Sequence, residues 1–238
     1  MTIGIIAAMD SEADILLDAL DEVEEIHTLG FIFNCGKIND NDIILCKSGV
    51  GKVNAAMATT LLINEFSAEL IINTGIAGGI KDCNTNDIVI ANELAWNDFD
   101  IRIFGYPYGQ VPGYPLRFIV NPEIIVLIKS ILSKQGLDYK EGLIISGDSF
   151  ITSKDMINYD DAIACEMEGC AVAQASTKAG VDFLVLRYIS DIVGHESQID
   201  DYHKFEDEMA NRSASITLEL LNNLWKNIMR LKVNLLRL

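Results

Sequence analysis

Residues 2–20 read TIGIIAAMDSEADILLDAL, a short apolar run followed directly by a segment with helical spacing. The run over residues 2–8 is continuous, which is typical of a strand buried on both faces of a sheet. In residues 11–20, apolar side chains such as Ile15 and Leu16 recur at the spacing of a helix. A buried strand that passes straight into a helix is the repeating unit of α/β proteins, and it predicts that class here.

The same alternation continues along the rest of the chain. Further strands are expected over residues 31–36, 42–47, 70–74, 87–94, 141–146 and 183–189. Helices are expected over residues 52–66, 121–136 and 168–179 and from residue 202 onward, with a long ordered loop over residues 96–115. No linker or repeat interrupts the pattern. We therefore predict one domain, residues 1–238, with three α/β/α layers around a central twisted mixed β-sheet.

The composition disfavours several classes of protein. The 238 residues include 18 Lys plus Arg against 35 Asp plus Glu, a net charge of −17, which disfavours nucleic acid and anionic membranes as partners. Five scattered cysteines and three histidines lack the spacing of a disulfide framework or a zinc site, so we expect reduced thiols and no metal. There is no signal-peptide pattern and no apolar run of roughly 20 residues. We expect a soluble, cytoplasmic protein.

Polar side chains and glycines follow several of the expected strands. Such segments are Met9-Asp10-Ser11-Glu12, Gly75-Ile76-Ala77-Gly78-Gly79, Ser146 to Ile151, and Ser190-Asp191. In α/β sheets, ligands bind at the carboxyl ends of the strands. Glu12 alone is explained as an acid that compensates a helix dipole, and Asp191 alone as a turn cap. Their joint placement after separate strands predicts a shared active site.

The run Cys165-Glu166-Met167-Glu168-Gly169 suggests that the ligand is a sugar derivative. It reads as the start of a helix, where the dipole stabilises the two acids, Glu166 and Glu168. Carboxylates accept hydrogen bonds from ring hydroxyls, and the thioether of Met167 suits an apolar sugar face. Phe150, just after a Gly-Asp turn, is placed to stack on a base. Together these residues predict a nucleoside site.

Three other segments resemble a dinucleotide-binding motif, a P-loop and a membrane anchor, but each fits that interpretation poorly. The 75–79 segment lacks the GxGxxG spacing of a dinucleotide fingerprint, although its glycines allow close backbone approach to a ligand. The 48–52 segment (SGVGK) lacks both the first glycine and the Ser or Thr of a P-loop. Residues 225–238 place cations on an apolar helix; a helix docked on the sheet is far commoner than a membrane anchor.

At these motifs the chain resembles the 5′-methylthioadenosine/S-adenosylhomocysteine nucleosidases of the purine nucleoside phosphorylase superfamily. The resemblance covers essentially the whole chain. The segments that carry it are Ile3 to Met9, Ser48 to Asn54, Ile72 to Gly75, Phe104-Gly105-Tyr106, Gly109 to Gly113, Gly142 to Asp148, Glu166-Met167-Glu168 and Ile189-Ser190-Asp191. It implies a nucleoside phosphorylase-like fold and a hydrolase that releases adenine, in methionine salvage and the activated methyl cycle, without a cofactor.

The resemblance also implies a role for each candidate residue. Glu12 corresponds to the general base that activates water, and Asp191 to the general acid that protonates adenine at N7. Glu168 binds ribose hydroxyls with Met167 against the sugar, while Phe150 and the Ile151 backbone contact adenine. The remaining implied substrate-binding residues are Met9, Val50, Ala77, Gly78, Glu166, Arg187, Ser190, Tyr202 and Phe205.

A homodimer is implied as well. Ile101, Phe104 and Pro112 match positions that reach the 5′-substituent pocket of the neighbouring subunit. Two departures from the family pattern bear on the site. Tyr202 and Phe205 match the aromatic lid residues only with a one-residue insertion, and a tyrosine replaces a phenylalanine. Ile76 stands where a small hydroxyl residue is often found.

The expected mechanism needs two carboxyl groups in opposite protonation states. Asp191 must be neutral, hence with a raised pKa in a dry pocket, and Glu12 ionised on the opposite face of the sugar. This is the arrangement of an inverting glycosidase. A phosphate nucleophile would need clustered cations, and arginine is the preferred residue. The first arginine of the chain is Arg102, in the expected long loop. Hydrolysis is therefore favoured over phosphorolysis.

Three alternatives stay open at this point. A purine or uridine phosphorylase would respond to added phosphate. A futalosine-type hydrolase would differ in pocket width near Tyr202 and Phe205. A non-catalytic nucleoside-binding protein would not need a buried protonated acid. The sequence does not rank methylthioadenosine, S-adenosylhomocysteine and 5′-deoxyadenosine as substrates.

Overall fold

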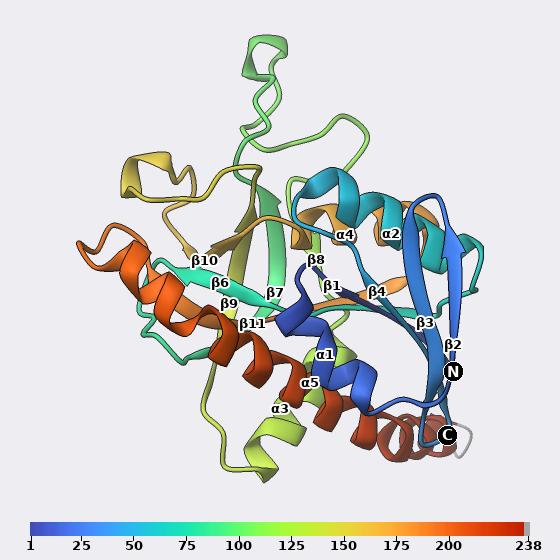
Figure 1. Cartoon of the computed structure of the whole chain (residues 1–238). Helices are drawn as coiled ribbons and strands as arrows, with labels where there is room; N and C mark the ends of the chain where they lie inside the picture. Colours follow the sequence, from blue (N-terminus) through green and yellow to red (C-terminus); the bar gives the residue numbers. More distant parts are fainter. Residues whose placement is uncertain (236–238) are drawn as a thin grey trace.

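Eleven β-strands pair edge to edge in the computed structural model, which describes the backbone of residues 1–235 and the side chains of residues 1–224 (Figure 1). Their order is β2-β3-β4-β1-β5-β11-β6-β10-β9-β7-β8. The strands are β1 (Thr2–Ala7), β2 (Asp21–Thr28), β3 (Phe31–Ile38), β4 (Asn41–Lys47), β5 (Leu70–Asn73), β6 (Ile76–Gly79), β7 (Ile88–Trp96), β8 (Phe118–Ile119), β9 (Tyr139–Ser146), β10 (Ala162–Glu166) and β11 (Asp182–Ile192). Parallel and antiparallel pairs both occur, so the sheet is mixed, as predicted.

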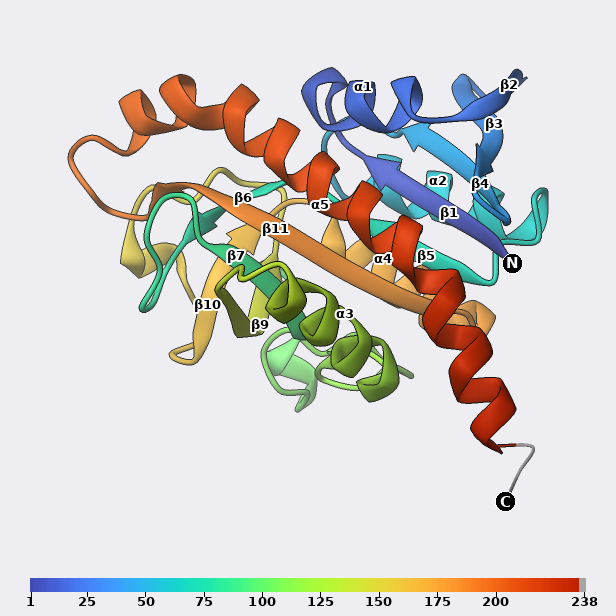
Figure 2. The same cartoon turned by 90° about the horizontal axis from the view of Figure 1, so that it is seen from below.

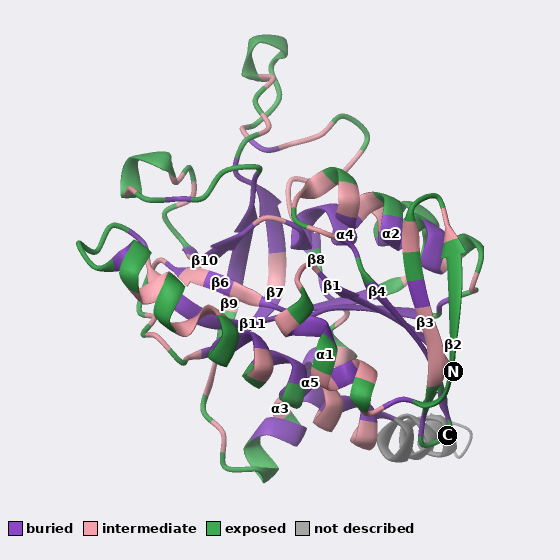
Figure 3. Cartoon of the chain, viewed as in Figure 1, coloured by how far each residue is buried: buried purple, intermediate pink, exposed green. Residues whose placement is uncertain are grey.

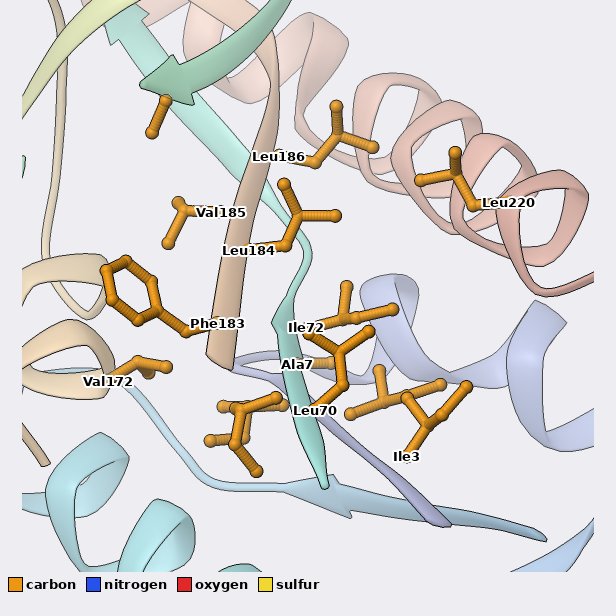
Figure 4. Close-up of a cluster of buried hydrophobic side chains, with 14 of the residues drawn as sticks. Ile3, Ala7, Leu70, Ile72, Val172, Phe183, Leu184, Val185, Leu186 and Leu220 are labelled. Atoms are coloured by element: carbon orange, nitrogen blue, oxygen red, sulfur yellow. The ribbon is translucent and has the colours of Figure 1, made fainter. Parts of the chain in front are cut away.

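The centre of the sheet is built from parallel, apolar strands. β1 pairs with β4 and β5, and β5 pairs with β11. Side chains such as Ile3, Ile72 and Leu184 are buried, and they pack with Val172 and Leu220 of the flanking helices (Figure 4). Burial on both faces explains why these strands read as continuous apolar runs in the sequence.

Five of the strands close into a ring. β11 pairs with β6 and with β7, and the series β6-β10-β9-β7 returns to β11. The register between β11 and β6 shifts between Ile189 and Asp191, so Ser190 is the extra residue of a β-bulge. Bulges redirect the neighbouring side chain and are frequent next to active sites. This bulge immediately precedes the candidate acid.

The helices form two layers, one on each face of the sheet. They are α1 (Asp10–Asp18), α2 (Lys52–Asn64), α3 (Pro122–Lys134), α4 (Gly169–Ala179) and α5 (Gln198–Leu235), with short 3₁₀ turns at η1 (Arg102–Phe104) and η2 (Lys154–Met156). Figure 2 shows α1, α3 and α5 on one face, with α5 lying along β11, and α2 and α4 on the other. Figure 3 shows the central strands buried, whereas the edge strand β2 and the outer faces of the helices are exposed. The predicted three-layer α/β/α fold is confirmed.

Local signals fix the helix ends. The side chain of Asn121 caps α3 by accepting a hydrogen bond from the Glu123 amide at 3.0 Å, and Pro122 is the first helical residue. Gly180 ends α4 in the left-handed conformation, with φ of 71°. Both ends lie where the sequence predicts them.

Several strands differ from the sequence expectation. β2 was not predicted, because its sequence DEVEEIHT is rich in acids and lies exposed at the sheet edge, without an apolar alternation. The short strands β8 and β10 were also not predicted. Residues 75–79 are not a turn, since β6 begins at Ile76. Glu166 is the last residue of β10 and not the start of a helix; α4 begins at Gly169.

The last helix begins four residues earlier than predicted, at Gln198, and its backbone continues to Leu235. The expectation that residues 225–238 dock on the sheet concerns side chains outside the described residues. No helix within the described part of the chain combines the length and apolarity needed to cross a bilayer.

Candidate active site

A cavity of about 100 Å³ lies beside the carboxyl ends of β1, β10 and β11 and the first residues of β6. Both candidate carboxyl groups, Glu12 and Asp191, line it. The other lining residues are Ala8, Met9, Val50, Ile76, Ala77, Gly78, Ser149, Phe150, Ile151, Cys165, Glu166, Met167, Glu168, Ser190, Gln198 and Tyr202. The polar segments predicted to follow separate strands therefore meet at one site.

Glu12 is held in the first turn of α1 by backbone amides. Its Oε2 accepts hydrogen bonds from the amides of Ala8 at 2.6 Å and Met9 at 3.1 Å, and its Oε1 from the amide of Ile76 at 3.2 Å. Burial raises the pKa of Glu12, while Arg187 and these three donors act in the opposite direction. The surroundings thus include four groups that favour the ionised form.

Gly75 makes this position of Glu12 possible. A Cβ atom at residue 75 would lie 2.5 Å from Glu12 Oε1, which is closer than any side chain permits. The close backbone approach that the glycines of this segment suggested is therefore to the candidate base itself.

Asp191 has a different environment, with neutral partners. It is only 2 % exposed. Its Oδ1 accepts a hydrogen bond from Ser190 Oγ at 2.6 Å, and its Oδ2 accepts one from Gln198 Nε2 at 2.8 Å. Burial raises the pKa of Asp191; these two donors oppose the rise and nearby Asp201 adds to it. Of the two carboxyl groups, Asp191 is the one suited to carry a proton, because Arg187 and backbone amides favour the charged form of Glu12.

Glu168 lies at the position before the first turn of α4. Its Oε1 accepts a hydrogen bond from the Gly51 amide at 2.7 Å. Burial, followed by the charge of Glu166, raises the pKa of Glu168 to about 7. The carboxyl group faces the cavity and offers oxygens to a polyhydroxylated ligand.

Glu166 also lines the cavity, but protein groups occupy its oxygens. Its Oε1 accepts a hydrogen bond from Ser146 Oγ. Its Oε2 accepts from the amides of Glu168 at 3.0 Å and Gly169 at 2.7 Å and from Arg187 Nη2 at 2.5 Å. The expected stabilisation of an acid by the α4 N-terminus is present, although Glu166 itself lies in a strand.

Arg187 supports the site from below the cavity. Its guanidinium donates to the Asn73 carbonyl oxygen at 2.9 Å and to Asn73 Oδ1 at 2.5 Å, besides the ion pair with Glu166. It does not line the cavity and is 1 % exposed. Its donors are directed at Asn73 and Glu166, and it holds Glu166 in place; the expected contact of Arg187 with substrate stays a prediction.

Two aromatic rings stand at the mouth of the cavity. The rings of Phe150 and Tyr202 lie 5.2 Å apart at 81°, an edge-to-face pair. Phe150 is 43 % exposed, so one face of its ring is available to a ligand. Phe205 does not line the cavity; its ring packs under Lys204, with Nζ 4.7 Å from the ring centre. The single chain therefore places one of the two expected lid aromatics at the site.

The three residues expected to serve a neighbouring subunit lie away from this cavity. Ile101, Phe104 and Pro112 belong to the loop after β7, which extends outward from the sheet (Figure 1). Phe104 is 75 % exposed. The position of the loop is consistent with an external contact, and the role of these residues stays a prediction.

Five lining residues were not among the candidates: Ala8, Ile76, Ser149, Cys165 and Gln198. Four of them are directly adjacent in the sequence to a candidate residue, and this adjacency is the signal that predicts them. Gln198 has no such signal, because it lies seven residues beyond Asp191 and reaches the acid only through the turn into α5.

Among the side chains of residues 1–224, no lysine, arginine or histidine lines the cavity. Lys52, which lines the separate groove beside α2, is paired with Asp98 at 2.7 Å and Asp148 at 3.3 Å. Among the described residues, no group of three or more His, Cys, Asp and Glu side chains is arranged to hold a metal ion. The titratable carboxyl groups of the lining are those of Glu12, Glu166, Glu168 and Asp191.

Comparison with known proteins places this site in a family. A model of the phosphorylase superfamily matches residues 2–222. The 5′-methylthioadenosine/S-adenosylhomocysteine nucleosidase of Geobacillus sp. is 41 % identical over 234 residues, covering 95 % of this chain and all of that protein.

Solved structures give the same result. S-adenosylhomocysteine nucleosidase from Streptococcus pyogenes, in complex with 5-methylthiotubericidin, superposes with a TM-score of 0.89 at 37 % identity, covering 94 % of this chain and 97 % of that one. Futalosine hydrolase of Helicobacter pylori superposes with a TM-score of 0.88 at 32 % identity, covering 94 % and 98 %.

Proposed function

The chain belongs to the phosphorylase superfamily, and we propose that within it the protein is a hydrolase that cleaves the N-glycosidic bond of 5′-methylthioadenosine and S-adenosylhomocysteine. The products are adenine and the 5′-substituted ribose. One observation carries the proposal: Glu12 and Asp191 line one cavity, where Arg187 and three backbone amides favour the ionised form of Glu12, while Asp191 has only neutral donors and a nearby acid. Such a pair can supply a base and an acid to the two sides of one scissile bond.

The reaction is a displacement by water at the anomeric carbon. The carbon–nitrogen bond breaks, its electron pair goes to the purine, and Asp191 delivers a proton to N7 so that a neutral base leaves. Glu12, ionised, accepts a proton from the water that forms the new carbon–oxygen bond. Each of these steps is worth roughly 100- to 10,000-fold in rate.

The rest of the lining binds the two halves of the substrate. Glu168 accepts hydrogen bonds from the ribose hydroxyls, and its charge stabilises the positive charge that develops on the sugar. Met167 packs against the sugar face. Phe150 stacks on adenine, and the backbone of Ile151 contacts the edge of the base. Support comes from the cavity lining, which contains all four side chains.

Water, and not phosphate, is the nucleophile. Phosphate binding requires cationic donors, and arginine clamps are the usual solution. Within the described part of the chain the cavity lining contains no cation, while Arg187 is directed at Asn73 and Glu166 and Lys52 is paired with Asp98. This distinguishes the protein from the phosphorylases of the same superfamily.

We further propose that the protein acts as a homodimer. A groove of about 740 Å³ lies on the other side of α2, lined mainly by apolar side chains of α2, α4 and the loop after β7. Val53 of α2 is 69 % exposed and Phe104 of the loop 75 %. Covering this face with a second copy would bury these side chains and bring Ile101, Phe104 and Pro112 toward the partner's 5′-substituent pocket.

The dimer is tested by light scattering after size-exclusion chromatography. Val53→Glu should give a monomer with weakened binding of S-adenosylhomocysteine. A wild-type protein that is monomeric at micromolar concentration would contradict the dimer.

The proposal extends to 5′-deoxyadenosine as a third substrate, to a place in methionine salvage and to a cytoplasmic location. The five cysteines are free thiols in the structure, which suits a reducing compartment. The mechanism proposed above does not depend on the metabolic pathway or on the location of the protein.

Adenine release from each nucleoside, with and without phosphate, tests the reaction. Turnover without phosphate, unchanged by its addition, is the expected result. Turnover that requires phosphate would identify a phosphorylase instead. Futalosine belongs in the same assay, since the structural similarity to a futalosine hydrolase makes that activity the second candidate. Preferential cleavage of futalosine would replace the proposed substrates and retain the mechanism.

A further inference from the structure

The side chain of Gln198 lines the cavity, and its amide bridges the candidate acid Asp191 and the backbone of Ile151. Its Nε2 donates to Asp191 Oδ2 at 2.8 Å and to the Ile151 carbonyl oxygen at 2.8 Å. Its Oε1 accepts a hydrogen bond from the Gly194 amide at 2.9 Å. The side chain is buried and belongs to the cavity lining.

The orientation of this amide is fixed by its partners. Nε2 has two N–H donors, and both are used, one on a carboxylate and one on a carbonyl. The reverse orientation would place the amide oxygen of Gln198 against two acceptors and its NH₂ group against an N–H. Both partners of Nε2, Asp191 and Ile151, line the cavity.

One edge of adenine can engage the same two partners, Asp191 and the Ile151 carbonyl group. That edge carries the exocyclic N6 amine, a donor, beside N7, an acceptor. A base that donates from N6 to the Ile151 carbonyl and receives a proton from Asp191 at N7 uses the two groups that Gln198 holds. A protonated Asp191 Oδ2 is a weaker acceptor than the ionised oxygen, so delivery of its proton to N7 competes with the hydrogen bond from the Gln198 amide.

We propose that Gln198 is an internal occupant of the base subsite, which adenine and adenine nucleosides displace when they bind. The inference rests on the proposed function, because it takes Asp191 as the acid and a purine as the leaving group. In this role Gln198 competes with adenine for Asp191 and Ile151 and takes no part in the chemical step.

The position of Gln198 couples this displacement to the mouth of the cavity. Gln198 is the first residue of α5, and Tyr202, one turn later, packs edge-to-face on Phe150. Releasing the amide also releases the Gly194 amide that anchors the preceding turn. Entry of the base and loosening of the segment from residue 194 to residue 202 are therefore one event.

Two variants and a control test the proposal. Gln198→Ala removes the amide, and Gln198→Met keeps nearly the same length without a donor. Ile199→Ala is the control, since Ile199 is the next residue in the same turn and is 58 % exposed. Circular dichroism and thermal unfolding establish that all three fold.

The first readout is the dissociation constant of adenine, measured by calorimetry on the full chain. Adenine must break the two hydrogen bonds that Gln198 Nε2 donates, and each weakens the affinity for adenine by about a factor of two or more. Both variants lack these bonds, so their dissociation constants for adenine should be about fivefold lower or better. KM for methylthioadenosine should fall in parallel. Ile199→Ala should match the wild type in both.

The second readout is made on the wild type, with Gln198→Ala used only to assign the resonances. The side-chain NH₂ resonances of Gln198, assigned by their loss in Gln198→Ala, should move to solvent-like positions when the wild type is saturated with adenine. Resonances that adenine leaves unmoved, or weaker adenine binding in both variants, would overturn the proposal and make Gln198 a structural support. A wild type that neither binds adenine nor releases it from a nucleoside would instead remove the proposed function.

Discussion

Asp191→Asn separates proton donation from every other contribution of residue 191. The side chain keeps its size, and its hydrogen bonds can be kept as well. The Asn oxygen accepts from Gln198 Nε2 at the 2.8 Å position, and the Asn NH₂ donates to Ser190 Oγ at the 2.6 Å position. Only the transferable proton is lost.

The expected loss of rate follows from the role of the acid. General acid catalysis contributes roughly 100- to 10,000-fold, equivalent to about 3 to 5 kcal/mol of transition-state stabilisation at about 1.4 kcal/mol per tenfold. We expect kcat for adenine release to fall by about that factor, because the Asn amide can hydrogen-bond N7 without protonating it.

Stability should respond in the opposite direction. Because burial raises the pKa of Asp191, the folded protein must hold a proton that the unfolded chain has released, and this costs folding free energy at any pH above the ordinary pKa of the side chain. A neutral Asn removes this cost, so the free energy of unfolding at pH 7 should stay the same or increase. Asp200→Asn makes the same chemical change at an exposed position on α5 and should alter neither quantity.

Adenine release and urea unfolding, measured on the same preparations, check the prediction. Wild-type turnover by Asp191→Asn would refute the acid assignment. A loss of rate accompanied by a comparable loss of unfolding free energy would show that residue 191 is a structural residue.

Three further predictions concern the groups around the acid. Arg187→Met should lower the free energy of unfolding by about 3 to 5 kcal/mol, because it leaves the buried carboxylate of Glu166 without its cation; unchanged urea unfolding would contradict the ion pair. Gly75→Ala should reduce kcat strongly, since the new Cβ meets Glu12 Oε1 at 2.5 Å, and a structure of the variant with Glu12 unmoved would contradict this. The profile of kcat/KM against pH should fall at low pH as Glu12 protonates and at high pH as Asp191 ionises, with both limbs displaced upward because burial raises both pKa values; Asp191→Asn should abolish the high-pH limb, and its persistence there would assign it to another group.

Much of the fold can be predicted from the sequence where burial is uniform. β1, β5 and β11 are buried on both faces and appear as apolar runs, while α3 and α4 carry cap residues at their ends. β2 could not be predicted, because an exposed edge strand has no apolar pattern and its pairing with β3 determines its conformation. β10 could not be predicted for a related reason: its last two residues, Cys165 and Glu166, read as part of the run that opens α4.

The candidate site shows the same division. Glu12, Glu168 and Asp191 follow separate strands, and the topology brings them into one cavity, as predicted. The sequence does not show where the guanidinium of Arg187 points. Its direction depends on Asn73, which lies on another strand and accepts its hydrogen bond. Gln198 reaches the cavity only through the conformation of the turn after β11, which no local pattern specifies.

The β-bulge at Ser190 has a consequence for how this enzyme can vary. Side chains alternate between the two faces of a strand, so the single additional residue determines on which side position 191 emerges. Substitutions in the outer loops leave that parity intact, whereas deleting Ser190 would turn the carboxyl group of residue 191, and the side chains that follow it in β11, to the opposite face. The number of residues in β11 is therefore as important for activity as their identity.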